Sequence, residues 1–126
     1  MSLTSMELVA EAKSQITEIE PAAAWEAMRT AQVLDVRETS EFEAARLPGA
    51  INIPRGVLEF KIGEHPALAQ RDTDILVYCK TSGRAALAAL NLQRMGYTRV
   101  RSIHGGIDAW RLHGLPLETE TTQFGD

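Results

Sequence analysis

The stretch DILVYCKTSGRAALAALNLQRMG, residues 74–96, decides the fold. DILVYC (74–79) is a compact apolar run typical of a buried strand, and GRAALAALNLQRMG (83–96) is the clearest helix in the sequence. The packing side of this helix is expected to hold several alanines together with Leu87, Leu90 and Met95. A strand that passes through a short turn into a helix is the repeating unit of parallel α/β proteins.

Similar alternation runs along the rest of the chain. Further strands are predicted within ITEIEP (16–21), AQVLDV (31–36), INIP (51–54) and TRVRSIHGG (98–106). Further helices are predicted within MELVAEAKSQI (6–16), PAAAWEAMRT (21–30), TSEFEAARLPGA (39–50), RGVLEFKI (55–62), PALAQ (66–70) and IDAWRLHG (107–114). Pro21 should occupy the first position of its helix, and Thr39 or Ser40 should cap the helix that follows them. The sequence therefore predicts an α/β fold with a central, mainly parallel sheet of about five strands, flanked by helices on both faces.

Length and composition limit the class of protein. With 126 residues, 44% of them hydrophobic and 24% charged, the chain is expected to form one globular domain. We expect an N-terminal helical arm at 1–14, the domain at 15–118 and a flexible tail at 119–126. The net charge of −4 gives no reason to expect a nucleic acid as partner. No apolar run is long enough to span a membrane, so we expect a soluble, cytoplasmic protein with no membrane partner.

Cys79 is the only cysteine, and it follows the most apolar strand directly. Ligands of parallel sheets bind beyond the carboxyl ends of the strands, where the first N–H groups of the next helix have no intrahelical partner. The N–H groups of residues 81–84, the helix dipole and the charges of Lys80 and Arg84 are expected to favour the thiolate of Cys79. The alternative is that Cys79 is a small buried hydrophobic residue. Three scattered histidines and one cysteine offer no metal-binding spacing, and no cofactor is expected.

Three motifs stand out along the chain: LDVRETSEFEAARLPGAINIP (34–54), YCKTSGRAALAALNLQRMG (78–96) and GGIDAW (105–110). Together they resemble the rhodanese domain, a sulfurtransferase module, in its single-domain form. The resemblance implies a rhodanese-like fold and a Cys79 thiolate that takes the sulfane sulfur of a donor such as thiosulfate and passes it to cyanide or a thiol, which could belong to a protein. It also implies that the loop residues Thr81, Ser82 and Gly83 cradle the persulfide, and that Lys80 and Arg84 hold the anionic donor.

The loop length separates this reading from its alternatives. Cys79 and Arg84 form a C-x4-R motif, whereas the related phosphatases and arsenate reductases use C-x5-R around a tetrahedral oxyanion. A Cys-dependent phosphatase or arsenate reductase is therefore disfavoured, while a sulfur-relay module for a protein partner would show the same loop. The family's loop most often has Arg in second place and Gly in fourth, where this chain has Lys80 and Ser82. Lysine lacks the bidentate fork of arginine, so these changes bear on the choice of donor.

Other polar residues are candidates for supporting roles. The resemblance places Asp35 and Arg37 near the catalytic loop, where Asp35 could accept hydrogen bonds from loop N–H or hydroxyl groups. Arg55 either reaches the mouth of the site, where it would help to recruit an anionic donor, or is a solvated surface residue. Glu41 is expected to act locally, as a cap or in a salt bridge, and Trp110 is expected in the core.

Overall fold

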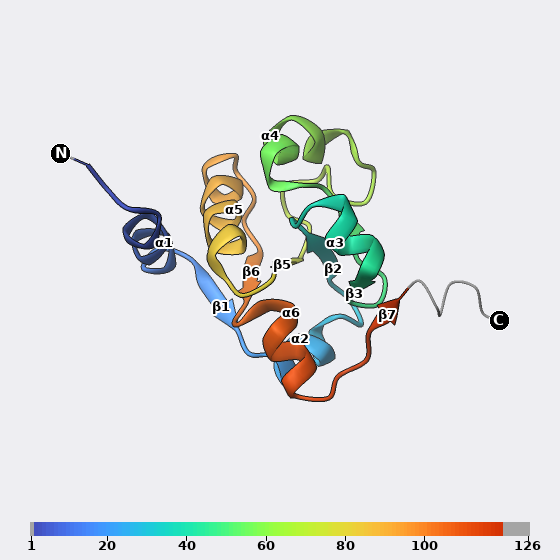
Figure 1. The fold of residues 1–126 in the computed structure, drawn as a ribbon. Helices are drawn as coiled ribbons and strands as arrows, with labels where there is room; N and C mark the ends of the chain where they lie inside the picture. Colours follow the sequence, from blue (N-terminus) through green and yellow to red (C-terminus); the bar gives the residue numbers. More distant parts are fainter. Residues whose placement is uncertain (1, 120–126) are drawn as a thin grey trace.

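A five-stranded parallel sheet forms the centre of the molecule in the computed structural model, which describes residues 2–119 (Figure 1). The strands lie in the order β1-β6-β5-β2-β4, and every neighbouring pair is parallel. Their bounds are β1 Thr17–Ile19, β2 Gln32–Asp35, β4 Ile51–Asn52, β5 Ile75–Tyr78 and β6 Val100–Ile103. The expected parallel sheet of about five strands is therefore confirmed.

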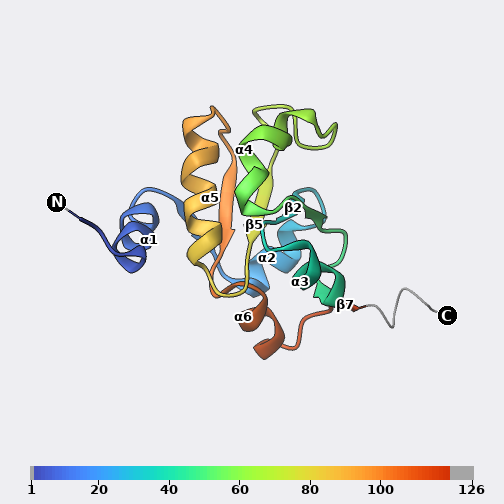
Figure 2. The same ribbon diagram turned by 45° about the horizontal axis from the view of Figure 1, so that its top comes forward.

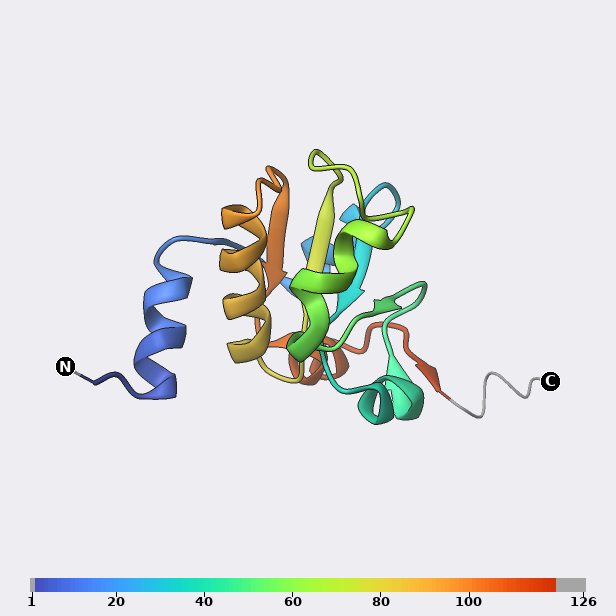
Figure 3. The same ribbon diagram turned by 90° about the horizontal axis from the view of Figure 1, so that it is seen from above.

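Helices cover both faces of this sheet, as the sequence predicts. They are α1 Ser5–Lys13, α2 Pro21–Ala27, α3 Thr39–Ala44, α4 Leu58–Lys61, α5 Gly83–Arg94 and α6 Gly106–Leu112, with 3-10 turns η1 Arg55–Val57 and η2 Ile62–Glu64. Buried residues of α4 and α5 pack on one face, and buried residues of α2 and α6 pack on the other. Figure 3 shows α4 and α5 on the near side of the sheet.

The central strand β5 explains why its sequence is continuously apolar. Ile75 and Val77 belong to the core under α4 and α5, while Leu76 and Tyr78 belong to the core under α2 and α6. Successive side chains of a strand point to opposite faces, and both faces are covered here. Trp110, expected in the core, is completely buried and meets Trp25 edge-on at a centroid distance of 6.0 Å.

Some local predictions were wrong. Residues 66–70 form turns rather than a helix. The N-cap of α3 is Glu38, one residue before Thr39, and it forms a capping box with Glu41. In α5 the completely buried residues are alanines and Leu92, whereas Leu87 and Leu90 are only partly buried. Ala85, Ala88, Ala89 and Leu92 belong to the core that α5 shares with the sheet, so mostly small side chains fill the inner side of this helix.

Both ends of the described chain pack against other elements. Glu118–Thr119 forms strand β7, which pairs antiparallel with β3, Ala45–Arg46. The expected flexible tail begins at Thr119, which belongs to β7, and the remainder of that tail lies outside the described residues. At the other end, α1 lies beside α5 in all views, and Ala12 is completely buried (Figures 1 and 2). None of the helices in residues 2–119 is long and apolar enough to cross a membrane.

Candidate active site

Cys79 follows the end of β5, with its side chain at the start of α5. The residue is 1% exposed and belongs to the core under α4 and α5, as the alternative of a buried cysteine requires. Its sulfur is nonetheless in polar contact, because the backbone N–H of Ala85 donates a hydrogen bond to Sγ at 3.3 Å. The thiol is therefore both buried and held at the N-terminal end of a helix, where partial positive charge is concentrated.

In the loop from Lys80 to Arg84, the backbone N–H groups and the carbonyl groups have different hydrogen-bonding states. Within residues 2–119, none of the N–H groups of this loop donates a hydrogen bond. The carbonyl groups of Cys79 and Lys80, by contrast, accept hydrogen bonds from the N–H groups of Ile107 and Asp108, at 3.0 and 3.1 Å. Unpaired N–H groups beside a sulfur atom are suited to hold an anion there.

Gly106 holds this loop against α6. It has a positive φ of 58°, and a Cβ at this position would collide with the carbonyl oxygens of Cys79 and Thr81 and lie 2.6 Å from that of Lys80. Only a residue without a side chain allows this approach and this backbone conformation. The sequence shows two adjacent glycines here, at 105 and 106, but gives no sign that this segment touches the cysteine loop.

The two cations of the loop are each paired with a carboxylate. Lys80 Nζ lies 2.8 Å from Asp108 Oδ2, and the side chain of Lys80 is largely exposed while that of Asp108 is partly buried. Arg84 donates two hydrogen bonds to Glu41, at 2.8 and 3.1 Å. This pairing raises the pKa of the Arg84 guanidinium and lowers the pKa of Glu41 to about 2. Glu41 thus caps its own helix as expected, but its salt bridge is with a residue 43 positions away rather than a local one.

Asp35, Arg37 and Tyr78 form a buried polar network beside the loop. Asp35 and Tyr78 are register partners at the ends of β2 and β5. The carboxylate of Asp35 accepts hydrogen bonds from the Tyr78 hydroxyl at 2.6 Å, from Arg37 Nη2 at 2.7 Å and from the Arg37 backbone N–H at 2.8 Å. The hydroxyl that donates to Asp35 belongs to Tyr78, the last residue of β5 directly before Cys79, and not to the loop residues that the sequence offered as donors.

The surroundings of Tyr78 and Arg37 in this network keep both residues protonated, as hydrogen-bond donors. Burial and the neighbouring carboxylate of Asp35 raise the pKa of Tyr78 far above its ordinary value, so its hydroxyl remains protonated. Burial alone would lower the pKa of Arg37, but the hydrogen bonds and charge of Asp35 outweigh it and raise that pKa. Arg37 Nη2 also donates to the carbonyl of Ala45 at 2.6 Å, which ties the network to β3.

Arg55 lies at the start of η1, where β4 has just ended. Its backbone N–H donates to the carbonyl of Val36, and its Nη1 lies 2.8 Å from Glu59 Oε2. Glu59 in turn accepts a hydrogen bond from Asn91 of α5. The Nε of Arg55 is buried and has no hydrogen-bond partner among the described residues. This side chain is thus only partly satisfied, unlike a solvated surface arginine.

Sequence reasoning missed the residues that pair with the loop from other elements. Asp108 of α6 and Lys13 of α1 contact Lys80 and Ser82 respectively. No sequence signal identifies them, because their partners lie 28 and 69 positions away. Among the described residues, no group of three or more metal-ligating side chains is present.

The comparisons with known proteins agree with the fold. The model of the rhodanese-like domain matches residues 20–113. A sulfurtransferase from Allochromatium vinosum is 33% identical over 85 residues, which cover 68% of this chain and 76% of the relative. A thiosulfate sulfurtransferase from Actinobacillus succinogenes is 33% identical over 105 residues, covering 82% of this chain and 91% of the relative.

Solved structures show the same architecture. A Rhodopseudomonas palustris protein of unknown function, described as a possible tyrosine phosphatase, matches with a TM-score of 0.81 and 31% identity over 94% of this chain and 96% of its own. The polysulfide-sulfur transferase homodimer of Wolinella succinogenes matches with a TM-score of 0.75 and 27% identity over 88% of this chain and 84% of its own. The chain belongs to the rhodanese-like domain family, whose relatives named here include sulfurtransferases. Helix α1 precedes the residues that the family model matches.

Proposed function

We propose that this protein is a thiosulfate sulfurtransferase in which Cys79 carries the transferred sulfur as a persulfide. Two features of the site carry the proposal. The sulfur of Cys79 accepts a hydrogen bond from the Ala85 N–H, and the N–H groups of the adjoining loop have no partner within residues 2–119. The sulfurtransferase relatives support the same reaction. No cofactor takes part in it.

The reaction is two displacements at one sulfur atom. The Cys79 thiolate attacks the outer sulfur of thiosulfate, a new S–S bond forms at Sγ, and the old S–S bond breaks with its electron pair leaving on sulfite. Cyanide or a thiolate then attacks the outer sulfur of the persulfide, and Cys79 leaves as the thiolate. The enzyme returns to its starting state, so no external oxidant or reductant is needed.

The residues of the loop would have different roles in this reaction. The N–H groups of residues 80–84 would bind the persulfide anion and the incoming donor, since preorganised backbone donors stabilise charge that develops in a reaction. Thr81, Ser82 and Gly83 shape this turn, and Lys80 is the cation best placed to meet the donor because it is largely exposed. Arg84, fixed by Glu41, would act by its charge and by fixing the loop.

Residues from neighbouring elements would support the loop. Asp35 and Arg37 act through the hydroxyl of Tyr78, which fixes the residue before the nucleophile. Arg55 is the candidate for donor recruitment by its positive charge, because its side chain is about a quarter exposed at the start of η1. We also propose that the rhodanese domain spans residues 15–118 and that residues 1–14 form an arm on it.

Intact mass measurement tests the proposal directly. After incubation with thiosulfate, the protein should gain about 32 Da, the mass of one sulfur atom, and lose it on addition of cyanide. The Cys79→Ser variant should show neither the gain nor any thiocyanate formation. Sulfur transfer to cyanide by Cys79→Ser would contradict the assignment of the nucleophile.

A sulfur-relay function is a second candidate, supported by a relative described as a putative sulfur carrier protein in Bacillus subtilis, 33% identical over 78 residues. A relay would form the same persulfide but discharge slowly to cyanide and rapidly to one protein thiol. Rates of persulfide loss to cyanide, to a small thiol and to candidate protein thiols separate the two functions.

A phosphatase function deserves a test because the Rhodopseudomonas structure is described as a possible tyrosine phosphatase. Two features argue against it here. The loop has one residue fewer than C-x5-R, and both terminal nitrogens of Arg84 are already bonded to Glu41. Hydrolysis of a phosphate ester, without any persulfide after thiosulfate treatment, would favour the phosphatase.

A further inference from the structure

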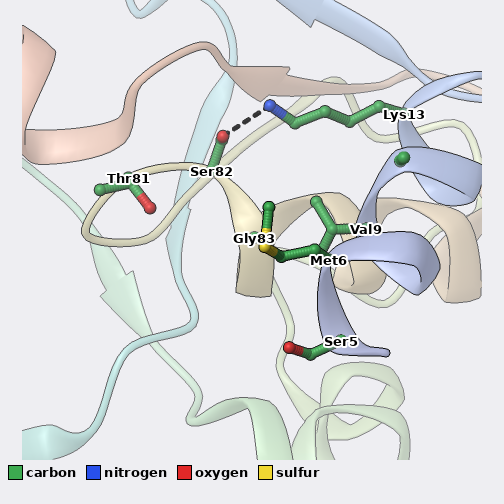
Figure 4. A pocket seen from close by; sticks show the side chains of 8 residues that line it. Ser5, Met6, Val9, Lys13, Thr81, Ser82 and Gly83 are labelled. Carbon is green, nitrogen blue, oxygen red and sulfur yellow. Dashed lines mark hydrogen bonds between the residues drawn. The ribbon is translucent and has the colours of Figure 1, made fainter. Parts of the chain in front are cut away.

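Helix α1 contacts the cysteine loop through a single polar side chain. Lys13 Nζ donates a hydrogen bond to Ser82 Oγ at 2.7 Å, and the two residues are 69 positions apart (Figure 4). Around this contact, α1 and residues 81–83 enclose a groove of about 360 Å³. Figure 4 shows Met6 and Val9 directed toward Gly83, and Val9 Cγ2 would lie 3.5 Å from a Cβ at that glycine. Apolar contact thus seats α1 where Lys13 reaches the loop.

Ser82 is the N-cap residue of α5, yet its hydroxyl does not cap the helix. A serine at this position ordinarily accepts a hydrogen bond from the N–H of the second or third helical residue. In α5 these residues are Arg84 and Ala85, and no side-chain cap bond is present. Ser82 has ψ −5° rather than the extended value usual at an N-cap, and its hydroxyl is bonded to Lys13 instead.

Of the two N–H groups that a capping Ser82 could bind, that of Arg84 has no partner among the described residues and that of Ala85 binds the sulfur. Ala85, the third residue of α5, donates to Cys79 Sγ. Ser82 Oγ and Cys79 Sγ are therefore competing acceptors for one donor. A hydroxyl oxygen accepts a stronger hydrogen bond from an N–H than the sulfur of a neutral thiol does. Without Lys13, the Ser82 hydroxyl is therefore expected to accept the Ala85 N–H.

We infer that Lys13 is a positioning residue: it holds the Ser82 hydroxyl away from the start of α5 and so reserves the Ala85 N–H for the sulfur of Cys79. The inference rests on the proposed function, because a reserved N–H matters where Cys79 must exist as a thiolate and then as a persulfide. Lys13 lies outside the residues matched by the family model. The positioning role therefore belongs to the N-terminal helix and not to the matched domain.

A direct effect of the lysine charge on the sulfur is the competing explanation. Glu18 Oε2 lies 3.7 Å from Lys13 Nζ and offsets part of that charge. The two explanations make different predictions when Ser82 is removed. Without the serine hydroxyl no competing acceptor exists, so Lys13 should then have little influence, whereas a direct charge effect would persist.

The experiment is a double-mutant cycle on the full chain, read as the rate of Cys79 alkylation by iodoacetamide between pH 6 and 9. The four proteins are the unaltered chain, Lys13→Met, Ser82→Ala and the double variant; the pairs formed by Lys80 and Arg84 are intact in all of them. Iodoacetamide is uncharged, so its approach is not steered by the lysine.

Lys13→Met should slow alkylation at pH 7 by about tenfold and move the rate profile to higher pH, as loss of a hydrogen bond to a charged group would. In the Ser82→Ala background the same substitution should change the rate by less than about twofold, and Lys13→Arg, which still donates to Ser82, should keep most of the original rate.

The outcomes are decisive in either direction. Equal slowing by Lys13→Met in both backgrounds would overturn the inference in favour of a direct charge effect or of detachment of α1. No slowing in either background would also overturn it. The assay reads thiol reactivity alone, so a failure of the proposed sulfur transfer would appear separately, as the absence of a persulfide from the mass measurement.

Discussion

At the scale of single residues, Tyr78 links the sheet to the cysteine loop. Its hydroxyl donates to Asp35 at 2.6 Å and accepts the N–H of Leu47 at 3.2 Å, and its side chain is completely buried. Arg37 Cζ lies 5.4 Å from the centroid of its ring. Buried polar groups are costly when left unpaired, so this hydroxyl stabilises the network by satisfying two partners.

Replacing Tyr78 by phenylalanine should lower the free energy of unfolding by about 2–3 kcal/mol, because a buried carboxylate and a buried N–H each lose a partner. Urea denaturation at pH 7 measures this loss. Tyr97→Phe is the matched control: its hydroxyl is also buried, but it donates to the neutral carbonyl of Leu68 and accepts from Arg71. It should cost about 1 kcal/mol, because the Leu68 carbonyl is neutral and the exposed guanidinium of Arg71 can bind water instead. Equal losses for the two variants would show that the charge of Asp35 adds nothing.

At the scale of elements, the start of α6 forms one wall of the candidate active site. The N–H groups of Ile107 and Asp108 bind the carbonyls of Cys79 and Lys80. Those bonds turn the carbonyl groups of Cys79 and Lys80 toward α6, while the loop N–H groups have no hydrogen-bond partner among the described residues. The approach of the two segments depends on Gly106, so a backbone contact between elements determines the electrostatics of the loop.

Gly106→Ala should destabilise the protein by about 3 kcal/mol or more, since it adds both a steric collision and an unfavourable positive φ. Gly114→Ala isolates the second effect: φ is +67° there, but a Cβ would meet nothing within 4 Å. It should cost only about 1–2 kcal/mol. Thermal denaturation of both variants gives the comparison. If Gly106→Ala loses no more stability than Gly114→Ala, the cysteine loop must be able to move aside and accommodate the added methyl group at little cost.

At the scale of the whole molecule, ion pairs join elements that are distant in the sequence. Arg84 and Glu41 connect α5 to α3, Lys80 and Asp108 connect the loop to α6, and Arg46 and Glu118 connect β3 to β7. Of these, the Glu41–Arg84 pair has a consequence for the acid stability of the fold. The pairing lowers the pKa of Glu41 from 4.5 to about 2 in the folded protein.

The sign of the pH effect follows from that direction. A group whose pKa is lower in the folded state stabilises the fold fully above its unfolded pKa, and this stabilisation disappears as the pH falls through the folded pKa. The Glu41 contribution should therefore be complete above about pH 4.5 and lost between about pH 4.5 and 2. Both side chains are about a third exposed, so solvent screening limits the contribution to under about 1 kcal/mol.

Glu41→Gln should accordingly reduce the free energy of unfolding by about 0.5–1 kcal/mol at pH 7, with the difference from the unaltered protein shrinking below pH 4.5. Urea denaturation at pH 7, 4 and 3 measures the difference. Glu26→Gln removes an exposed pair with Arg29 and should have almost no effect at any of these pH values. A difference for Glu41→Gln that stayed constant down to pH 3 would contradict the assigned shift.

Much of the fold was predictable because its signals are local. The run from Ile75 to Tyr78 is apolar at every position, as a strand covered on both faces requires, and Pro21 begins α2 as its fixed φ favours. The turn at 66–70 was mistaken for a helix because a few alanines and a leucine favour helices without any cap to begin one. The β3–β7 pair was missed because strands of two residues carry no periodicity.

By itself, the sequence determined the strand–Cys79–loop–helix order, the parallel sheet and the small set of residues around the thiol, since periodicity, turn residues and helix starts act over a few neighbouring positions. Only the tertiary structure decided which partners those residues meet: Glu41 for Arg84, Asp108 for Lys80, Tyr78 for Asp35, Gly106 for the loop and Lys13 for Ser82. The physical reason is range. A charge or a hydroxyl bonds with whatever group lies within about 3 Å, and that neighbour is set by the packing of the whole chain rather than by the residues beside it.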